Sequence, residues 1–398
     1  MNFTLDSLRR TTNQRAFIPE IDGLRFLSIA TVVVYHLNPA YARNIGKDAG
    51  FGLSQMGSMW DMHTLAWWWA RLDLGVKVFF SISGFVLALP FLKSLLQGGH
   101  SVNLKEYFIR RLTRLEPPFV VTLTLFLIVH VTMLGKPLGE MMPHFLAGLV
   151  YSHKFIFGTS NPINPVTWSL ETEAQFYVIV PFLFLLLARL GKTWARISLI
   201  LSACMLSVLL RRQAFYRQDE LLHLSSSILV FFVNFATGML FAWLYLARES
   251  FIRVKSPLWD VIGIVSILGM FFFYKPQHFV SNNILFNLCI FIMMVSVFKG
   301  PILNRFFTMK FVYVTGGMCY TIYLIHYSFM FFIIRFTKDL STGMGYVPDM
   351  LLQMAVVFPV LFMVSALFFL LVEKPCMDKH WPQRLTAYLR ERFKPSVR

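Results

Sequence analysis

LQMAVVFPVLFMVSALFFLLV, residues 352–372, is an apolar stretch without a charged side chain. As an α-helix it is about 30 Å long, at 1.5 Å per residue, which matches the hydrocarbon core of a bilayer. The whole chain shares this character: 56% of its 398 residues are hydrophobic, with 42 phenylalanines, and the mean hydropathy is +0.60. A soluble domain of this size cannot bury so much apolar surface. The sequence therefore predicts an all-α polytopic membrane protein.

Ten apolar segments are long enough to cross a bilayer. They cover residues 24–38, 74–96, 118–134, 172–188, 197–210, 225–247, 258–274, 283–298, 311–334 and 351–372. An eleventh segment, residues 144–158, is short and contains His144, His153 and Lys154. Its length and polarity favour an interfacial or re-entrant position over a further span.

The distribution of Lys and Arg favours ten spans with both termini in the cytoplasm. In that arrangement the inner segments hold roughly twice as many basic residues as the outer ones, as the positive-inside rule requires. A span at residues 144–158 would move the excess to the outside. We expect a single membrane domain over residues 1–398 in the cytoplasmic membrane. Its core covers 17–375, its short tails are 1–16 and 376–398, and no cleavable signal peptide is visible.

The formal net charge of +17 could also indicate nucleic-acid binding. Basic cytoplasmic loops that meet anionic lipid headgroups explain the same charge, and no RNA- or DNA-binding motif is present. The cysteines are scattered and suggest neither a disulfide framework nor a zinc site, and no other metal-ligand pattern is apparent. They are Cys204, Cys289, Cys319 and Cys376. We therefore expect membrane lipids as partners, and neither nucleic acid nor metal.

The first apolar segment begins as EIDGLRFLSIATVVVYHL, residues 20–37, and contains two ionisable side chains. Arg25 and His36 are eleven residues apart, so on a helix they share a face and lie about 16 Å apart along the axis. Asp22 lies three residues before Arg25 and can pair with it. A purely structural explanation is that Arg25 forms a buried ion pair at one end of the helix and His36 lies at the membrane interface at the other end. However, ionisable residues inside a membrane usually face a functional cavity.

Five further motifs follow in order. They are VFFSISGFVLALPF (78–91), YFIRRLTRLEPPFV (107–120), PVTWSLETEAQFYVIVPF (165–182), GGMCYTIYLIHYSF (316–329) and LVEKP (371–375). Together with Arg25 and His36, this series resembles the acyltransferase family 3 of membrane O-acyltransferases, over nearly the whole chain. The resemblance implies ten helices and transfer of an acyl group, most often acetyl, from acyl-coenzyme A to a hydroxyl. The family's acceptors are mostly sugars of surface polysaccharides, with some smaller secreted compounds.

The resemblance also implies a donor site formed by Arg25, Arg110, Arg111 and Arg114. Arginine binds phosphate through bidentate hydrogen bonds, and these residues lie on the predicted cytoplasmic side, where acetyl-CoA or another acyl-CoA is available. The coenzyme is a donor substrate, and we expect no permanently bound cofactor. Alternatively, the basic cluster of the second motif is only a topogenic signal that meets lipid headgroups.

His36 is a suitable general base because imidazole titrates near neutral pH. Glu173 begins the predicted fourth span on the outer side, so it can orient His36 as the third member of a catalytic triad does, or it can be a helix N-terminal carboxylate. The resemblance places Trp168, Ser169 and Tyr177 near the substrates. His326 can line the acceptor site or be a core histidine, and Arg25 completes the set of catalytic candidates.

Two features depart from the family. Many members carry an acidic residue where this chain has Lys77, so any role of that acid does not transfer. Some members also carry an extracytoplasmic hydrolase-like domain, whereas here the sequence ends soon after residues 371–375. The alternative functions are a secondary transporter that uses the buried Arg, His and Glu as a proton relay, and a non-catalytic scaffold. The acceptor, the acyl length, a covalent intermediate and the oligomeric state stay open.

Overall fold

The structure is a computed structural model that describes residues 5–10, 17–97, 102–217, 223–274, 279–378, 381–384 and 386. Within these residues every regular element is a helix. Each of the ten predicted segments lies on a helix. The long helices are α1 (Pro19–Asn44), α4 (Leu74–Gln97), α5 (Leu104–Thr132), α8 (Trp168–Arg189), α9 (Thr193–Tyr216), α10 (Ile228–Ala247), α12 (Leu258–Phe273), α13 (Val280–Lys299), α16 (Cys319–Thr337) and α17 (Tyr346–Phe368).

Short helices connect the long ones. They are α2 (Ala49–Ser54), α3 (Leu65–Trp69), α6 (Leu138–Leu149), α7 (His153–Phe157), η1 (Pro165–Thr167), α11 (Glu249–Arg253), α14 (Pro301–Phe307), α15 (Lys310–Gly317), the π-helical turn η2 (Phe369–Glu373) and α18 (Lys374–Cys376). Among the described residues, 8 helical stretches are long and apolar enough to cross a membrane by length and composition. They fall on all the long helices except α1, which holds Arg25 and His36, and α12, which has 16 residues.

One predicted segment differs in detail from the helices observed, and the excluded segment agrees with its prediction. The segment at 311–334 was predicted as one span but is divided into α15 and α16 at Met318. The break follows Gly316, whose backbone packs so closely on α1 that an added Cβ would lie 1.7 Å from the carbonyl oxygen of Asp22. Residues 144–158 form the end of α6, a turn at Tyr151 with φ 54°, and α7. No helix of spanning length covers this stretch, which agrees with its exclusion from the predicted spans.

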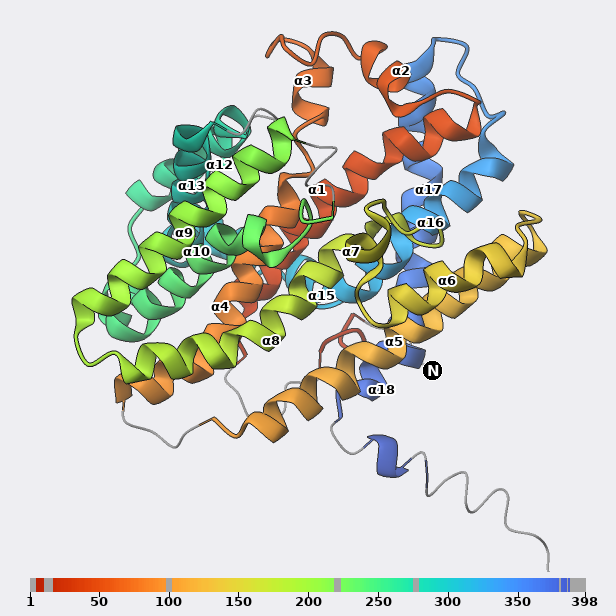
Figure 1. Cartoon of the computed structure of the whole chain (residues 1–398). Helices are drawn as coiled ribbons and strands as arrows, with labels where there is room; N and C mark the ends of the chain where they lie inside the picture. Colours follow the sequence, from red (N-terminus) through yellow and green to blue (C-terminus); the bar gives the residue numbers. More distant parts are fainter. Residues whose placement is uncertain are drawn as a thin grey trace, which may run out of the picture.

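Helix α1 lies at the centre of the bundle, between two groups of helices (Figure 1). One hydrophobic core unites α1 with α4, α8, α10 and α13, and includes Leu24, Phe80, Phe176 and Phe235. The other unites α1 with α5, α16 and α17. A helix with several polar groups is stable within a membrane only where protein surrounds those groups. The central position of α1 therefore explains how it tolerates Arg25 and His36.

The crossing of α4 and α10 depends on two glycines. An added Cβ at Gly84 would lie 2.0 Å from the carbonyl oxygen of Phe235, and one at Gly238 would lie 1.7 Å from that of Ser81. Small residues at such crossings let helix backbones approach closely in membrane proteins. In addition, the Ser81 hydroxyl donates a 2.8 Å hydrogen bond to the Asn234 carbonyl across the same contact. These residues fix the spacing between the two most extensively packed helices.

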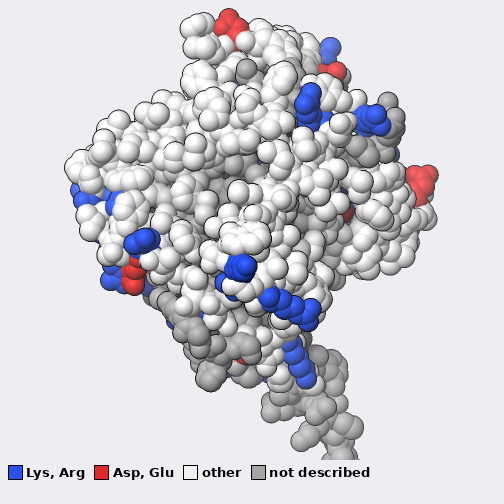
Figure 2. Space-filling model, turned by 60° about the vertical axis from the view of Figure 1, so that its left-hand side comes forward, with Lys and Arg blue, Asp and Glu red and all other residues white. Residues whose placement is uncertain are grey.

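Both described ends of the chain lie on one side of the bundle. In the N-terminal segment 5–10, the Ser7 carbonyl accepts a hydrogen bond from Lys374, and Asp6 forms an ion pair with Lys310. Trp381 donates to the carbonyl of Thr113 on the same side. Figure 2 shows Lys and Arg across the lower part of one face and at its upper right, with a broad area without charged residues between them.

Gly238→Ala should destabilise the protein, because the new methyl group meets a backbone oxygen that cannot move without separating α4 from α10. Overpacking of this kind typically costs about 1–3 kcal/mol, so the unfolding temperature of detergent-purified protein should fall. Gly139→Ala in α6 is the matched control, since no atom lies within 4 Å of its added Cβ. Equal unfolding temperatures for the Gly238→Ala variant and the wild type would contradict this account of the crossing.

Candidate functional site: an arginine pocket and a histidine pair

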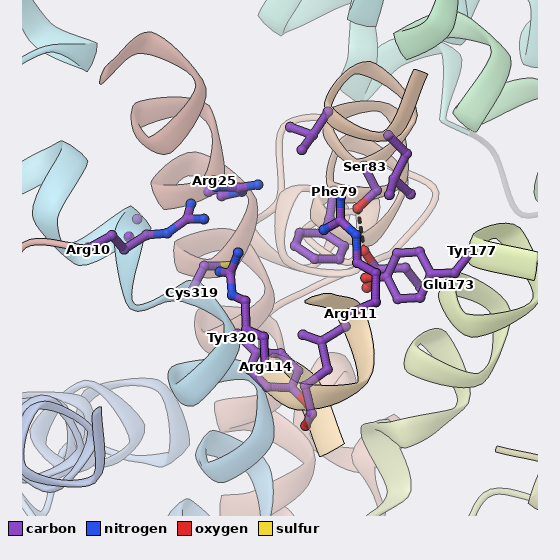
Figure 3. A pocket seen from close by; sticks show the side chains of 15 residues that line it. Arg10, Arg25, Phe79, Ser83, Arg111, Arg114, Glu173, Tyr177, Cys319 and Tyr320 are labelled. Carbon is purple, nitrogen blue, oxygen red and sulfur yellow. Dashed lines mark hydrogen bonds between the residues drawn. The ribbon is translucent and has the colours of Figure 1, made fainter. Parts of the chain in front are cut away.

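Four arginines from three segments converge on one cavity (Figure 3). Arg25 comes from α1, Arg111 and Arg114 come from α5, and Arg10 comes from the N-terminal segment. The cavity measures about 50 Å³ and is also lined by Ser83, Glu173, Tyr177, Cys319 and Tyr320. A volume of this size holds a phosphate-sized group or one or two water molecules, not a whole nucleotide.

Asp22 holds two of these arginines in place. Its Oδ1 accepts hydrogen bonds from Arg25 at 2.5 Å and from Arg10 at 2.8 Å, and its side chain is 5% exposed. The Asp22–Arg25 pair was predicted from the spacing in the sequence, whereas Arg10 was not predicted, because nothing in a polar tail marks one arginine as buried. Burial lowers the pKa of the Arg10 guanidinium, and the charge of Asp22 counteracts this effect.

Glu373 forms an ion pair with Arg114. Its Oε1 lies 3.9 Å from Arg114, and its Oε2 accepts hydrogen bonds from the backbone NH and the hydroxyl of Thr321. Within the described part of the chain, the Nε atoms of Arg10 and Arg114 are buried without a hydrogen-bond partner. Arg111 contacts the rings of Tyr107 and Tyr177. Buried donors normally find acceptors, so the unpaired NH groups make this cavity suited to an anion.

Arg110 does not belong to the pocket. Its side chain is 46% exposed and forms an ion pair with Glu106 one turn earlier on α5. Of the three arginines predicted in the second motif, the structure therefore brings Arg111 and Arg114 to Arg25 and leaves Arg110 on the surface. The motif alone contains no information about which arginine faces inward.

Glu173 lies in the arginine pocket, not beside His36. It accepts a 2.6 Å hydrogen bond from the Ser83 hydroxyl, and Tyr177 lies next to it (Figure 3). This corrects the predicted role of Glu173 as the carboxylate that orients His36. Ser83 was not singled out from the sequence, although it lies in the first of the five motifs.

The depth of Glu173 has a structural cause. The chain enters the bundle before α8 begins, and Asn161, Ile163, Asn164 and Thr167 are all buried. Asn164 donates to the carbonyl of Leu324, which fixes this segment against α16. The helix therefore begins inside the protein, and Glu173 reaches the level of Cys319 and Tyr320. These two lie six to seven residues before His326, or about 10 Å along α16.

His36 instead pairs with His326. The Nε2 of His326 lies 3.1 Å from the Nδ1 of His36, and its Nδ1 faces the carbonyl oxygens of Tyr323 and Ile322 at 2.8 and 3.1 Å. The Nδ1 of His326 must therefore carry a proton, which makes its Nε2 an acceptor in the neutral ring. The Nδ1 of His36 then donates, and it also lies 2.9 Å from the Val32 carbonyl. The lone pair of His36 is left on Nε2, which makes no hydrogen bond to the described residues.

Trp168 and Ser169, which were also predicted to contact substrate, make contacts within the protein. Trp168 packs on Phe80 and Phe231 in the hydrophobic core. Ser169 donates a 3.0 Å hydrogen bond to the hydroxyl of Tyr323, one turn from His326. Trp168 lies outside the pocket, whereas Tyr177 lines it.

The two ends of α1 thus present different chemistry. At the level of Arg25, fixed guanidinium groups can bind an anion. Three helical turns away, His36 offers an imidazole nitrogen that can accept a proton, among the rings of Tyr35, His326 and Tyr327. This arrangement suits an enzyme whose substrates carry an anionic group at one end and react at the other.

The comparisons with known proteins agree with this description. The model of the family described as "Acyltransferase domain" matches residues 18–374. The peptidoglycan O-acetyltransferase OatA of Listeria monocytogenes is 25% identical over 344 residues, which cover 80% of this chain and 50% of that protein. The O-acetyltransferase OatA of Staphylococcus aureus is 24% identical over 338 residues, covering 80% of this chain and 51% of that protein.

The chain thus spans about half the length of the curated relatives it matches. No solved structure matches it. Since the family model covers almost all of the bundle, from the start of α1 to Lys374, the resemblance seen in the motifs is confirmed. The chain belongs to the acyltransferase family 3, and it is a multi-pass membrane protein of that family.

Proposed function

We propose that the protein is a membrane O-acyltransferase that transfers an acyl group, preferably acetyl, from cytoplasmic acyl-CoA to the hydroxyl of an exported acceptor. The observation that supports this most is the position of Arg25 and His36 on one buried helix. Arg25 belongs to an anion-binding pocket, and the free Nε2 of His36 lies about 16 Å further along the axis. A donor with phosphates at one end and a reactive thioester at the other fits such a separation.

In this proposal the arginine pocket binds phosphate oxygens of the coenzyme. Arg111 and Arg114 extend from the first turns of α5, and Asp22 and Glu373 hold the neighbouring guanidinium groups. The cavity of about 50 Å³ admits one phosphate-sized group, so the adenosine part of the coenzyme remains outside it. Glu173 has a positioning role here, through Ser83 and Tyr177.

The transfer needs a base and a good leaving group. His36 Nε2 takes the proton of the acceptor hydroxyl, while the oxygen of that hydroxyl attacks the carbonyl carbon of the thioester. The C–S bond breaks, and the sulfur of coenzyme A leaves with the bonding electrons and takes up the proton from His36 Nε2. His326 accepts the hydrogen bond from His36 Nδ1 and so keeps the reactive lone pair on Nε2. His326 is therefore a positioning residue in this mechanism, whereas the sequence left open whether it lines the acceptor site or is a core histidine.

We further propose ten spans, with both termini on the cytoplasmic side of the cell membrane. Contacts between the segment 5–10 and Lys374 and Lys310 support an even number of crossings. Counting α1 and α12 with the 8 longer apolar stretches gives the ten. The positive-inside rule then assigns the arginine pocket to the cytoplasm.

For the acceptor we propose a sugar hydroxyl of a cell-surface glycan, with peptidoglycan as the first candidate. Two of the relatives are named for peptidoglycan or O-acetyl transfer. The transferase is favoured over the secondary transporter because the family match covers residues 18–374.

Arg111→Ala should weaken acetyl-CoA binding by about tenfold to a hundredfold, because one charge-assisted hydrogen-bonding group is worth about 1.5–3 kcal/mol. Arg110→Ala, the neighbour on the same helix, is the control and should bind normally, because its ion pair with Glu106 is on the surface. Arg111→Lys should restore binding only in part. Equilibrium binding of labelled acetyl-CoA to purified protein measures this, and equal losses in the Arg110 and Arg111 variants would assign both to a general charge effect.

His36→Ala should lower acyl transfer by at least about a hundredfold, the usual value of base catalysis, while acetyl-CoA binding stays close to that of the wild type. His326→Ala should lower turnover as well, and the double variant should be little worse than His36→Ala, because the residues act as a unit. His63→Ala, on the exposed outer loop, is the control. A folded His36→Ala protein with more than about a tenth of normal turnover would exclude the base role.

A reporter enzyme that is active only outside the cytoplasm should stay silent when fused to the C-terminus, and one that is active only in the cytoplasm should work there. The reason is the excess of basic residues on that side of the proposed topology. Fusions in the loop between α2 and α3 should give the opposite pattern. Activity of the external reporter at the C-terminus would reverse the orientation of the whole bundle.

A further inference from the structure

A second group of buried cations lies away from the arginine pocket, along α4. Asp73 precedes α4, and Ser83, which lines the arginine pocket, lies ten residues later, or about 15 Å along the axis. Near this end, Ser28 of α1 donates a hydrogen bond to the carbonyl of Gly75. Asp73 also interacts electrostatically with Tyr35, which precedes His36. The group thus lies at the end of the bundle where His36 lies.

Three cations and one carboxylate make up this cluster, which we name the outer cation cluster: Arg71, Asp73, Lys77 and Arg211. The three cationic residues are each 5% exposed. Asp73 Oδ2 accepts hydrogen bonds from Lys77 at 2.8 Å and from the Tyr274 hydroxyl at 2.7 Å. Among the described residues, Asp73 is the carboxylate within electrostatic range of all three cations. With three cations and one carboxylate, the described residues of the cluster carry a net charge of +2.

The partners of the three cations differ. Arg71 stacks on Trp67 at 4.0 Å and donates to the carbonyl of that residue, so the backbone holds it. Lys77 has Asp73. Arg211 lies 5.3 Å from the ring of Phe231, and its Nη1 is buried without a hydrogen-bond partner among the residues that the structure describes. A buried guanidinium without an acceptor is costly, and in membrane proteins such a residue usually faces a partner or a substrate path.

We propose that the outer cation cluster binds a carboxylate or phosphate carried by the acyl acceptor, with Arg211 as the principal contact and Lys77 beside it. An oxyanion here would supply the missing acceptor for Arg211 and would neutralise part of the excess charge. Asp73, with a side chain 29% exposed, marks where the cluster meets the surface. The substrate class is thus an acidic saccharide. The identification of the ligand as the acceptor rests on the proposed function, but the anion site does not.

Binding can be tested without acyl transfer. The unfolding temperature of the full chain in neutral detergent should rise saturably with methyl glucuronide and with glucose 6-phosphate, but not with methyl glucoside, which lacks the charge. Salt should weaken the effect. In Arg211→Met, binding of both acidic probes should be at least about tenfold weaker, which corresponds to 1.4 kcal/mol.

Two control variants define the location. Arg212→Met, at the exposed neighbouring position on α9, should respond to the acidic probes as the wild type does. Arg111→Met should keep its response to methyl glucuronide, which carries no phosphate for the arginine pocket to bind. Loss of the response in Arg111→Met, or its persistence in Arg211→Met, would overturn the proposal by placing the anion elsewhere.

The stability of Arg211→Met without ligand gives an independent outcome. If Arg211 lacks a counterion, removing its charge should leave the unfolding temperature unchanged or higher. A clear fall would show an internal ion pair and overturn the proposal. Stabilisation by phosphatidylglycerol in nanodiscs, without any effect of the acidic saccharides, would instead assign the cluster to lipid.

The acyl-transfer assay separates this inference from the proposed function. With both correct, Arg211→Met should raise the KM for an acidic acceptor at least about tenfold and leave kcat and acetyl-CoA binding nearly unchanged. Absence of any transfer by the wild type, with probe binding intact, would refute the transferase and keep the anion site. Transfer with an unchanged KM in Arg211→Met would refute the site and keep the transferase.

Discussion

The ion pairs of the Asp22 carboxylate are the interactions on which the half of the structure around the arginine pocket depends. The carboxylate joins Arg25 of the central helix to Arg10 of the N-terminal segment, in surroundings where neither arginine could remain charged and unpaired. The backbone of Asp22 is also the surface on which Gly316 packs, where a methyl group would not fit. One residue therefore fixes the N-terminal segment, the break between α15 and α16, and the direction of two guanidinium groups.

Buried charge is organised by level along the bundle. Arginines with carboxylates behind them form one level, the neutral histidine pair forms a second about 16 Å away, and the outer cation cluster lies at the far end of α4. Among the described residues, the buried guanidinium nitrogens without a hydrogen-bond partner belong to Arg10 and Arg114 of the arginine pocket and to Arg71 and Arg211 of the outer cation cluster. An anionic substrate would pair with these groups. The other buried unpaired polar atoms, such as the hydroxyls of Ser227, Ser296 and Ser365, belong to uncharged side chains elsewhere or to Glu373.

In the proposed mechanism, the histidine pair prepares the base without a carboxylate. In a catalytic triad an acidic residue fixes the imidazole tautomer. Here two backbone carbonyls fix His326, and His326 fixes His36. A neutral partner avoids the desolvation cost of a second buried charge. It also provides less stabilisation of the imidazolium, and this would suit the thioester donor that we propose, since a good leaving group demands less of the base.

The sequence by itself determined the helical membrane fold, the positions of the ten apolar segments, the Asp22–Arg25 pair and the family. These follow from hydrophobic length, helical spacing and motif order, which are properties of neighbouring residues. The tertiary structure alone decided that Arg111 and Arg114 face the pocket while Arg110 does not, that Arg10 joins them, and that Glu173 lies below the level of His36. It also paired His36 with His326, which are separated by 290 residues. The reason is physical: a helix fixes only relative angles along itself, whereas depth and partner depend on where other segments enter the bundle, as residues 161–167 do before α8.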